Sequence, residues 1–264
     1  MCEIFCFNSN KAKQVNESLK CFYEHSDEHP HGWGLVNIQN NEFTIDKEPL
    51  KANNSQYLKD LLHYPIVGKN IFAHIRLATV GENIFHNCQP FTQSDGNNRL
   101  WMLIHNGTIF DYPKLDKYKE KEKGNTDSER ILLFIIDKIN EFEHNKGGLS
   151  TIKERFILLN GLIADLSKNN KLNLMIYDGD LTYIHSNTKD SLYYLKNEDS
   201  FLISSTPLNN DESWKNVEIN KLFALIDGNI IFESKAHENE FIFTLEHEKA
   251  IEDFLNTLKQ DGQY

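Results

Sequence analysis

The sequence is poor in cysteine and contains no C-x-x-C pair. Its 264 residues include four cysteines, namely Cys2, Cys6, Cys21 and Cys88. A secreted protein of this size with a disulfide framework would usually carry a denser set. The cysteine content therefore favours a reducing compartment, and we expect a cytoplasmic protein.

Excess positive charge and long apolar runs are lacking as well. Lys and Arg number 28 against 39 Asp and Glu, so the formal net charge is −11. Because affinity for nucleic acid comes from clustered basic residues, we expect no nucleic-acid partner and no attraction to anionic membranes. The longest aliphatic run, ILLFII at 131–136, is too short to span a bilayer, and polar residues fill positions 8–18, where a signal peptide would be apolar.

Nucleotide-binding signatures are also missing. The chain has neither a G-x-x-x-x-G-K-[ST] loop nor a G-x-G-x-x-G turn, and it shows no internal repeat or Pro/Ser-rich linker. We therefore expect one domain over residues 1–264.

The elements that the pattern predicts come in blocks. Strands are expected first, then two long helices in succession, then strands again, with hairpin turns at Asp178-Gly179 and Asp227-Gly228. This order is typical of an α+β fold with two mostly antiparallel sheets. Strands are predicted at 2–7, 32–39, 41–50, 70–79, 100–110, 171–186, 191–197, 200–205 and 221–234, and helices at 15–23, 55–64, 128–142, 149–166 and 244–259.

The first stretch, MCEIFCF, places a cysteine directly behind the initiator methionine. Removal of Met1 would leave Cys2 with a free amine and a thiol on one carbon, which can act together as base and nucleophile. The alternative is that Cys2 merely begins a buried strand, since Cys2, Ile4 and Cys6 alternate with larger or charged neighbours.

Arg76 and Asp127 offer opposite charges for a small ligand. Arg76 lies in the apolar segment AHIRLATVG, where its planar guanidinium requires a partner such as a carboxylate. Asp127 follows Thr126 in GNTDSER, which also resembles a helix N-terminus with Thr126 as N-cap and Glu129 three residues later. A carboxylate in the first turn of a helix is favoured in any case.

Asn106 and Gly107 in IHNGTI have two interpretations. One is a type I′ turn at the end of a strand. The other is an oxyanion site that uses the Asn106 side-chain amide and the Gly107 backbone N–H.

Taken in order, the segments MC, HGWG, AHIRLATVG with NCQPF, HNG and TDSE resemble the class II, N-terminal-nucleophile glutamine amidotransferases, in particular their stand-alone YafJ-like (type 4) branch. The resemblance covers residues 1–140 densely and continues faintly through LISSTPL. It implies a four-layer αββα Ntn-hydrolase sandwich. His31 and Gln89 differ from the residues that members of this family often carry at these positions. The differences affect the expected rim of the substrate pocket.

The resemblance also implies roles for individual residues. Cys2 would be the nucleophile, and Asn106 with Gly107 would form the oxyanion hole. Arg76, helped by Thr79, would bind the α-carboxylate of glutamine, and Asp127 would bind its α-ammonium. No cofactor or metal is expected, because the spacing of the histidines matches no zinc signature.

The implied reaction is hydrolysis of the γ-amide of glutamine through a cysteinyl thioester. An ammonia acceptor would lie on a separate synthase subunit or be absent. Two alternatives stay open: a γ-glutamyl amide or peptide hydrolase with a larger donor, and a non-enzymatic glutamine-sensing or scaffold subunit.

Overall fold

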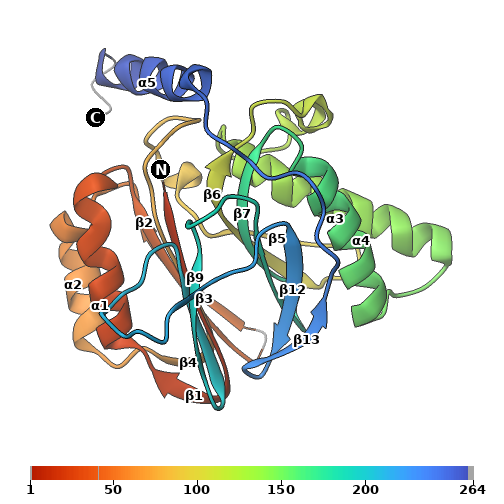
Figure 1. Cartoon of the computed structure of the whole chain (residues 1–264), viewed down its shortest axis with the longest axis horizontal. Helices are drawn as coiled ribbons and strands as arrows, with labels where there is room; N and C mark the ends of the chain where they lie inside the picture. The colour runs from red at the N-terminus through yellow and green to blue at the C-terminus, as the bar shows by residue number, and fades with distance from the viewer. Residues whose placement is uncertain (1, 41, 261–264) are drawn as a thin grey trace.

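The structure is a computed structural model that describes residues 2–40 and 42–260. Two antiparallel sheets pack face to face, and helices cover their outer faces (Figure 1). The first sheet has the order β11-β9-β10-β1-β4-β2-β3, and the second has the order β13-β12-β8-β7-β6-β5. The strands of the first sheet are β1 (Glu3–Gln14), β2 (Trp33–Gln39), β3 (Glu42–Glu48), β4 (Val67–Ile75), β9 (Tyr193–Asn197), β10 (Ser200–Ser204) and β11 (Lys215–Asn216). Those of the second are β5 (Phe91–Ser94), β6 (Leu100–Thr108), β7 (Lys171–Tyr177), β8 (Thr182–Ser186), β12 (Lys221–Ile226) and β13 (Asn229–Glu233).

Two pairs of helices form the outer layers. Helices α1 (Asn16–Glu24) and α2 (Gln56–His63) bury Leu19 and Leu58 in a core with Phe5 and Trp33 of the first sheet. Helices α3 (Asp127–Lys146) and α4 (Ile152–Leu166) form the corresponding core against the second sheet. The four layers confirm the expected αββα sandwich.

A third core lies between the sheets and fixes which side chains face inward. Ile4 and Cys6 of β1 pack there against Ile104 of β6 and Met175 of β7. Because side chains alternate along a strand, the even positions of β1 and β6 and the odd positions of β7 face the gap between the sheets. Cys2, one strand period before Ile4, belongs to this inner face.

The predicted elements agree with the structure except at four places. Strand β1 continues to Gln14, beyond the predicted range of 2–7. Arg76 lies just beyond the end of β4 and not within the strand, because the ladder ends at Ile75. Asn106 and Gly107 form no I′ turn but stay within β6, paired with Asn173 and Leu172. The short strands β5 and β11 were not predicted, since runs of four and two residues carry little periodic signal.

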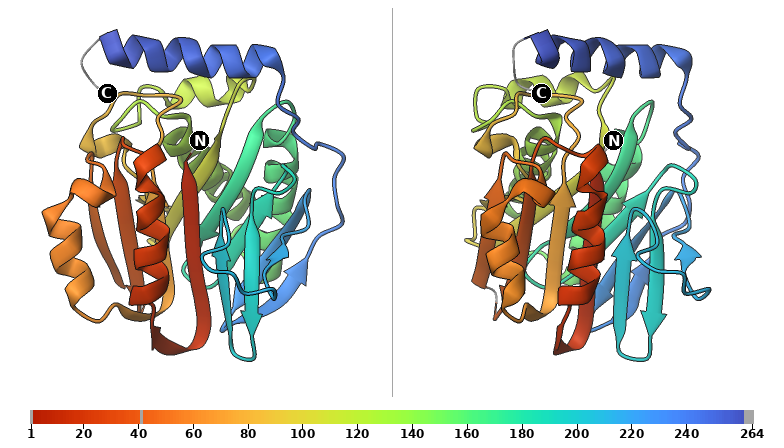
Figure 2. Two further views of the ribbon diagram at one scale, coloured as in Figure 1. Left: turned by 60° about the vertical axis from the view of Figure 1, so that its left-hand side comes forward. Right: turned by 90° about the vertical axis from the view of Figure 1, so that its left-hand side faces the viewer.

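After β13 the chain crosses back over the sandwich and ends in α5 (Leu245–Gln260). Both views in Figure 2 show α5 lying across the end of the sandwich where β1 begins. Among the described helices, none has the length and apolarity needed to cross a membrane.

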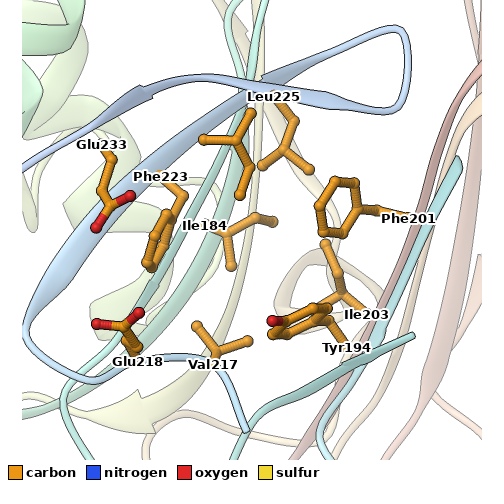
Figure 3. A pocket seen from close by; sticks show the side chains of 10 residues that line it. Ile184, Tyr194, Phe201, Ile203, Val217, Glu218, Phe223, Leu225 and Glu233 are labelled. Atoms are coloured by element: carbon orange, nitrogen blue, oxygen red, sulfur yellow. The ribbon is translucent and has the colours of Figure 1, made fainter. Parts of the chain in front are cut away.

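A narrow apolar cavity of about 130 Å³ lies between the sheets where they diverge, among strands β8 to β13. Figure 3 shows Phe201, Ile203 and Leu225 pointing into it, with Glu218 and Glu233 along one side. None of the predicted site residues lines this cavity, so it is separate from the candidate site described next.

Candidate active site

Cys2 lies immediately before β1, at the end of the sandwich that α5 crosses. Its side chain is half-buried, and Sγ donates to the backbone oxygen of Leu77 at 3.3 Å. Leu77 follows Arg76 in the segment that leaves β4, which is the antiparallel neighbour of β1. The pairing of these two strands therefore brings Cys2 and Arg76 to the same end of the sheet. The expected removal of Met1 concerns a residue outside the described part of the chain.

Arg76 is buried, and its guanidinium is held by the loop that follows it. Nη1 donates to Glu82 O, and Nη2 donates to both Val80 O and Gly81 O, each at 3.0 Å. A guanidinium has five N–H groups, so these bonds use three and occupy both hydrogens of Nη2. One N–H of Nη1 and that of Nε are left for a ligand.

Asn106 projects inward from β6 and is linked to β1 through a serine. Its Nδ2 lies 3.1 Å from Ser205 Oγ, which also accepts the Ile4 backbone N–H at 3.0 Å. The Ser205 backbone N–H in turn donates to Ile4 O at 3.0 Å. Ser205 thus fixes the Asn106 side chain relative to the start of β1, directly after Cys2.

The buried Oδ1 of Asn106 has no hydrogen-bond partner among the described residues. An amide has nearly the same shape when its oxygen and nitrogen are exchanged. In the exchanged orientation the Ser205 hydroxyl would donate to Oδ1, and Nδ2 would take the buried position that lacks a partner. Either way, one buried polar atom of Asn106 is available to a ligand.

The edge of β6 that faces away from β7 presents the backbone N–H of Gly107 and contacts Asp127 of α3. The backbone of His105 binds the Gln89 side chain on this edge, with N–H donating to Oε1 at 2.6 Å and O accepting from Nε2 at 3.2 Å. Because backbone groups alternate along a strand, the Gly107 N–H points to the same edge. Two residues later the Ile109 N–H donates to Asp127 Oδ2 at 2.8 Å.

Gly107 is enclosed so tightly that no side chain would fit. A Cβ at this position would lie 2.0 Å from Lys171 O and 2.2 Å from His105 Nε2. The His105 ring occupies this space because Nε2 donates to Lys171 O at 3.2 Å, while Nδ1 faces Ser128 Oγ at 2.9 Å. Burial lowers the pKa of His105.

Asp127 is the first residue of α3, and Thr126 is the N-cap, as predicted. Thr126 Oγ1 accepts from the Glu129 backbone N–H at 3.2 Å. The Glu129 carboxylate does not return to the N-cap; it accepts from the backbone N–H groups of Lys123 and Gly124 at 2.8 and 2.9 Å. The carboxylate of Asp127 is thereby held at a helix N-terminus beside the open edge of β6.

Thr79 joins the segment after β4 to the end of β6, since its hydroxyl lies 2.9 Å from that of Thr108. The structure thus gathers all six predicted site residues around one end of the sandwich. A cavity of about 220 Å³ is lined by Val80, Ile109 and Asp127 among others, whereas Cys2 and Arg76 do not line it.

The charges of the site act on one another. Burial raises the pKa of the Cys2 thiol, and the Arg76 guanidinium opposes this by favouring the thiolate. Burial lowers the pKa of Arg76, while Cys2 and Asp127 act in the opposite direction. Burial, together with the Arg76 charge, also lowers the pKa of His31 to about 4, so its imidazole is neutral, and Nδ1 accepts the Ala78 N–H at 2.9 Å.

Three residues of this region were missed by the sequence reasoning. Ser205 lies in LISSTPL, where only a faint signal exists, and Thr108 directly follows the HNG segment. Lys171 begins β7 opposite Thr108 and carries no motif at all. Only the pairing of β6 with β7 could have pointed to Lys171.

Comparisons with known proteins were made with the whole chain. The family model "Glutamine amidotransferases class-II" matches residues 1–201. An uncharacterised protein of Methanocaldococcus jannaschii is 27% identical over 265 residues, which covers 89% of this chain and 72% of that protein. YafJ of Escherichia coli, which is named a putative glutamine amidotransferase, is 24% identical over 209 residues. The match covers 78% of this chain and 80% of YafJ.

Solved structures show the same fold. A predicted glutamine amidotransferase from Pseudomonas aeruginosa superimposes with a TM-score of 0.61 at 17% identity, covering 88% of this chain and all of that one (100%). The glutamine phosphoribosylpyrophosphate amidotransferase of Bacillus subtilis gives a TM-score of 0.64 at 18% identity, covering 90% of this chain and 50% of that one.

Proposed function

Since the chain belongs to the class-II glutamine amidotransferases, we propose that it hydrolyses the γ-amide of glutamine to glutamate and ammonia through a cysteinyl thioester. The observation that carries the proposal is the convergence of Cys2, Arg76, Asn106 and Asp127, which come from four separate segments, on one end of the sandwich. A cation and an anion there suit the two charged ends of an amino acid, and the thiol lies beside them.

The reaction begins with the Cys2 sulfur attacking the δ-carbonyl carbon of glutamine. Removal of Met1 frees the α-amine of Cys2. An unperturbed α-amine has a pKa of about 7.7–8 and is partly neutral at physiological pH, so this group can take the thiol proton. The amine then returns a proton to the leaving nitrogen, and ammonia departs from the tetrahedral intermediate. Water cleaves the γ-glutamyl thioester, which yields glutamate and restores the thiol.

The oxyanion of the tetrahedral intermediate is held by Asn106 and the Gly107 N–H. Asn106 is buried and positioned by Ser205. Gly107 is half-buried, and its N–H is positioned by the alternation of backbone groups along β6. Loss of one such donor typically lowers kcat by about 10²–10³-fold.

Substrate binding divides between two charges. Arg76 offers the α-carboxylate its charge, one Nη1 hydrogen and the Nε hydrogen, because Nη2 is occupied by Val80 and Gly81. Thr79 supports this end. Asp127 attracts the α-ammonium at the open edge of β6, where it already anchors Ile109. In this proposal an acceptor for the ammonia lies on a separate polypeptide or is absent.

The test is release of ammonia and glutamate by the purified chain, with the mass of its N-terminus measured in the same sample. We expect turnover of glutamine or of another γ-glutamyl amide by the chain that has lost Met1, and loss of turnover in Cys2→Ala. The matched control is Cys21→Ala, which removes a half-buried cysteine of α1 and should leave turnover unchanged.

The donor panel separates the alternatives. Turnover of larger γ-glutamyl compounds but not of glutamine would assign the chain to the γ-glutamyl hydrolases. Glutamine binding without turnover by the processed chain would contradict catalysis and indicate a glutamine-sensing subunit.

A further inference from the structure

Lys171 is a buried lysine whose side chain faces the candidate active site. It is the first residue of β7, stands directly opposite Thr108 of β6 and is only 5% exposed. Odd positions of β7 face the gap between the sheets, as Met175 in the inter-sheet core shows. Cys2, immediately before β1, continues the inward-facing series of Ile4 and Cys6 in the first sheet, so the two residues lie on facing sheets.

The surroundings of the Lys171 ammonium lack a carboxylate. Among the described residues, no Asp or Glu lies within ion-pair distance of it, and the Phe243 ring lies 5.4 Å from Nζ. Phe243 belongs to the segment that leads into α5, and α5 lies across this end of the sandwich (Figure 2). Burial lowers the pKa of Lys171 to about 8, and the negative charge of Cys2 is what acts against that lowering.

Two buried arginines have different partners. The guanidinium of Arg155 bonds Asp178 at 2.6 Å and Asp180 as well, whereas that of Arg76 donates only to the backbone carbonyls of Val80, Gly81 and Glu82 among the described residues. A buried ammonium with no anion destabilises a fold. Within residues 2–40 and 42–260, Lys171 has no carboxylate as a counter-ion, and the negative charge of the Cys2 sulfur favours its ammonium form.

We propose that Lys171 is the counter-ion of the Cys2 thiolate and thereby sets the pH at which the nucleophile forms. The proposal rests on the proposed function for the role of Cys2. When the thiol loses its proton to the α-amine, the ammonium of Lys171 stabilises the negative sulfur across the gap between the sheets. The Phe243 ring shields the pair from water and so strengthens their attraction. Lys171 acts through Cys2 and is a positioning residue.

The charges around Lys171 come from three directions. Cys2 faces it from β1, and His105 binds its backbone oxygen from β6 while remaining neutral through burial. Asp127 favours the protonated form of His105 and disfavours the thiolate of Cys2. Among the described residues, Arg76 also favours the thiolate of Cys2, so loss of the Lys171 charge should weaken the ionisation of the sulfur without abolishing it.

The experiment measures the rate at which iodoacetamide alkylates Cys2 between pH 6 and pH 10, resolved from the other three cysteines by peptide mass. We expect Lys171→Met to raise the midpoint of this profile by about one pH unit or more, which lowers alkylation at pH 7 about tenfold. Lys171→Arg keeps the charge and should retain the profile of the unaltered protein. The control is Lys196→Met. Lys196 lies on β9, and its Nζ also lies over an aromatic ring, 4.7 Å from the centre of the Phe201 ring.

Each outcome decides the proposal. An unchanged midpoint in Lys171→Met overturns it, even if glutamine turnover falls. If Lys171→Met does not fold, as judged by circular dichroism, Lys171→Gln takes its place with the same expectation. A raised midpoint in a protein that turns over no γ-glutamyl compound would retain the Cys2–Lys171 pair while refuting the proposed function.

Discussion

Lys171 should make the free energy of unfolding depend on pH, because its ammonium is buried without a carboxylate beside it. Its pKa is lowered to about 8 by burial, whereas an exposed lysine in the unfolded chain titrates near 10.4. Between these two values the unfolded state binds more protons, so the folded state gains stability as pH rises. Below pH 8 the full penalty of the charge applies, and above about pH 10.5 it has vanished.

The size of the effect follows from the gap between the two pKa values. One pKa unit corresponds to about 1.4 kcal/mol, so the penalty at pH 7 is about 3 kcal/mol. About 2 kcal/mol of this is relieved between pH 7 and pH 10. Lys171→Met removes the charge while keeping the length and apolar character of the side chain. We therefore expect the variant to be more stable than the unaltered protein at pH 7, and this advantage to shrink toward pH 10.

The assay is urea unfolding followed by fluorescence at pH 7, 8, 9 and 10 for both proteins. The difference between their free energies of unfolding isolates Lys171, because the tyrosines and the other lysines titrate in both. A difference that is independent of pH would refute the reasoning, since it would mean that Lys171 titrates as an exposed lysine.

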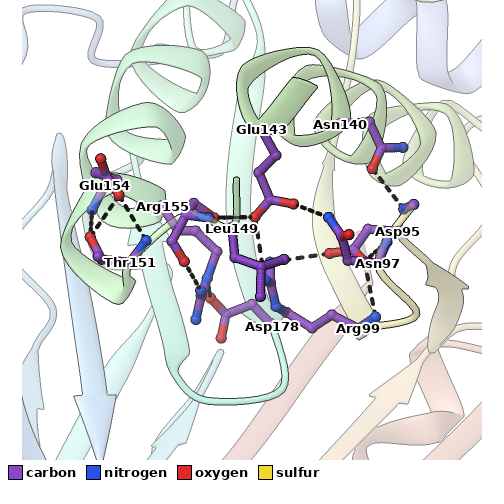
Figure 4. Close-up of polar contacts among 12 residues, drawn as sticks. Asp95, Asn97, Arg99, Asn140, Glu143, Leu149, Thr151, Glu154, Arg155 and Asp178 are labelled. Carbon is purple, nitrogen blue, oxygen red and sulfur yellow. Dashed lines mark hydrogen bonds and ion pairs between the residues drawn. The ribbon is translucent and has the colours of Figure 1, made fainter. Parts of the chain in front are cut away.

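Three further predictions concern other residues. Gly107→Ala should abolish turnover and lower the melting temperature, because the new methyl group would overlap Lys171 O and His105 Nε2; near-normal kinetics with an unchanged melting temperature would disprove that enclosure. Ser205→Ala should lower kcat about tenfold or more while changing KM little, since Asn106 and the Ile4 N–H lose their shared partner. The measurement is steady-state kinetics, and the control is Ser204→Ala, which alters a neighbouring buried serine. Asp178→Asn should lower the free energy of unfolding by about 3 kcal/mol and leave kcat of the folded fraction unchanged, because it removes the buried one of the two carboxylates that pair with Arg155 (Figure 4); a loss under about 1 kcal/mol in urea unfolding would contradict the predicted role.

The Asp178 network illustrates how the rest of the molecule supports the site. Asp178 Oδ1 accepts from the backbone N–H groups of Asp180 and Leu181, and Oδ2 accepts from Tyr183 and from Arg155 of α4. The hairpin of β7 and β8 is thus fixed to the helical layer. In the same region Glu143 of α3 accepts from the Ser150 N–H at 2.9 Å (Figure 4). The bonds of Asp178 hold β7 at the end where it turns into β8. Lys171 begins β7 at the opposite end.

Much of the fold could be predicted from local patterns. The Thr126 cap, the end of α2 before Pro65 and the two Asp-Gly hairpins depend on neighbouring residues alone, and the structure contains all of them. The end of β4 could not be predicted, because Arg76 continues an apolar run and only the tertiary structure shows that the pairing with β1 stops at Ile75. Asn106-Gly107 suits a turn equally well by composition, and the pairing of β6 with β7 overrides that preference.

The sequence by itself determined which residue types are present for chemistry: a cysteine behind Met1, an arginine and an aspartate for the two ends of an amino acid, and an Asn-Gly pair. The tertiary structure alone decided how they meet. The pairing of β1 with β4 carries Cys2 to the segment of Arg76, and Ser205 connects Asn106 to the start of β1. Lys171 shows the difference most clearly, since nothing in its local sequence marks it. Its burial opposite Cys2 arises only when two sheets, formed by segments far apart in the chain, close over a common gap.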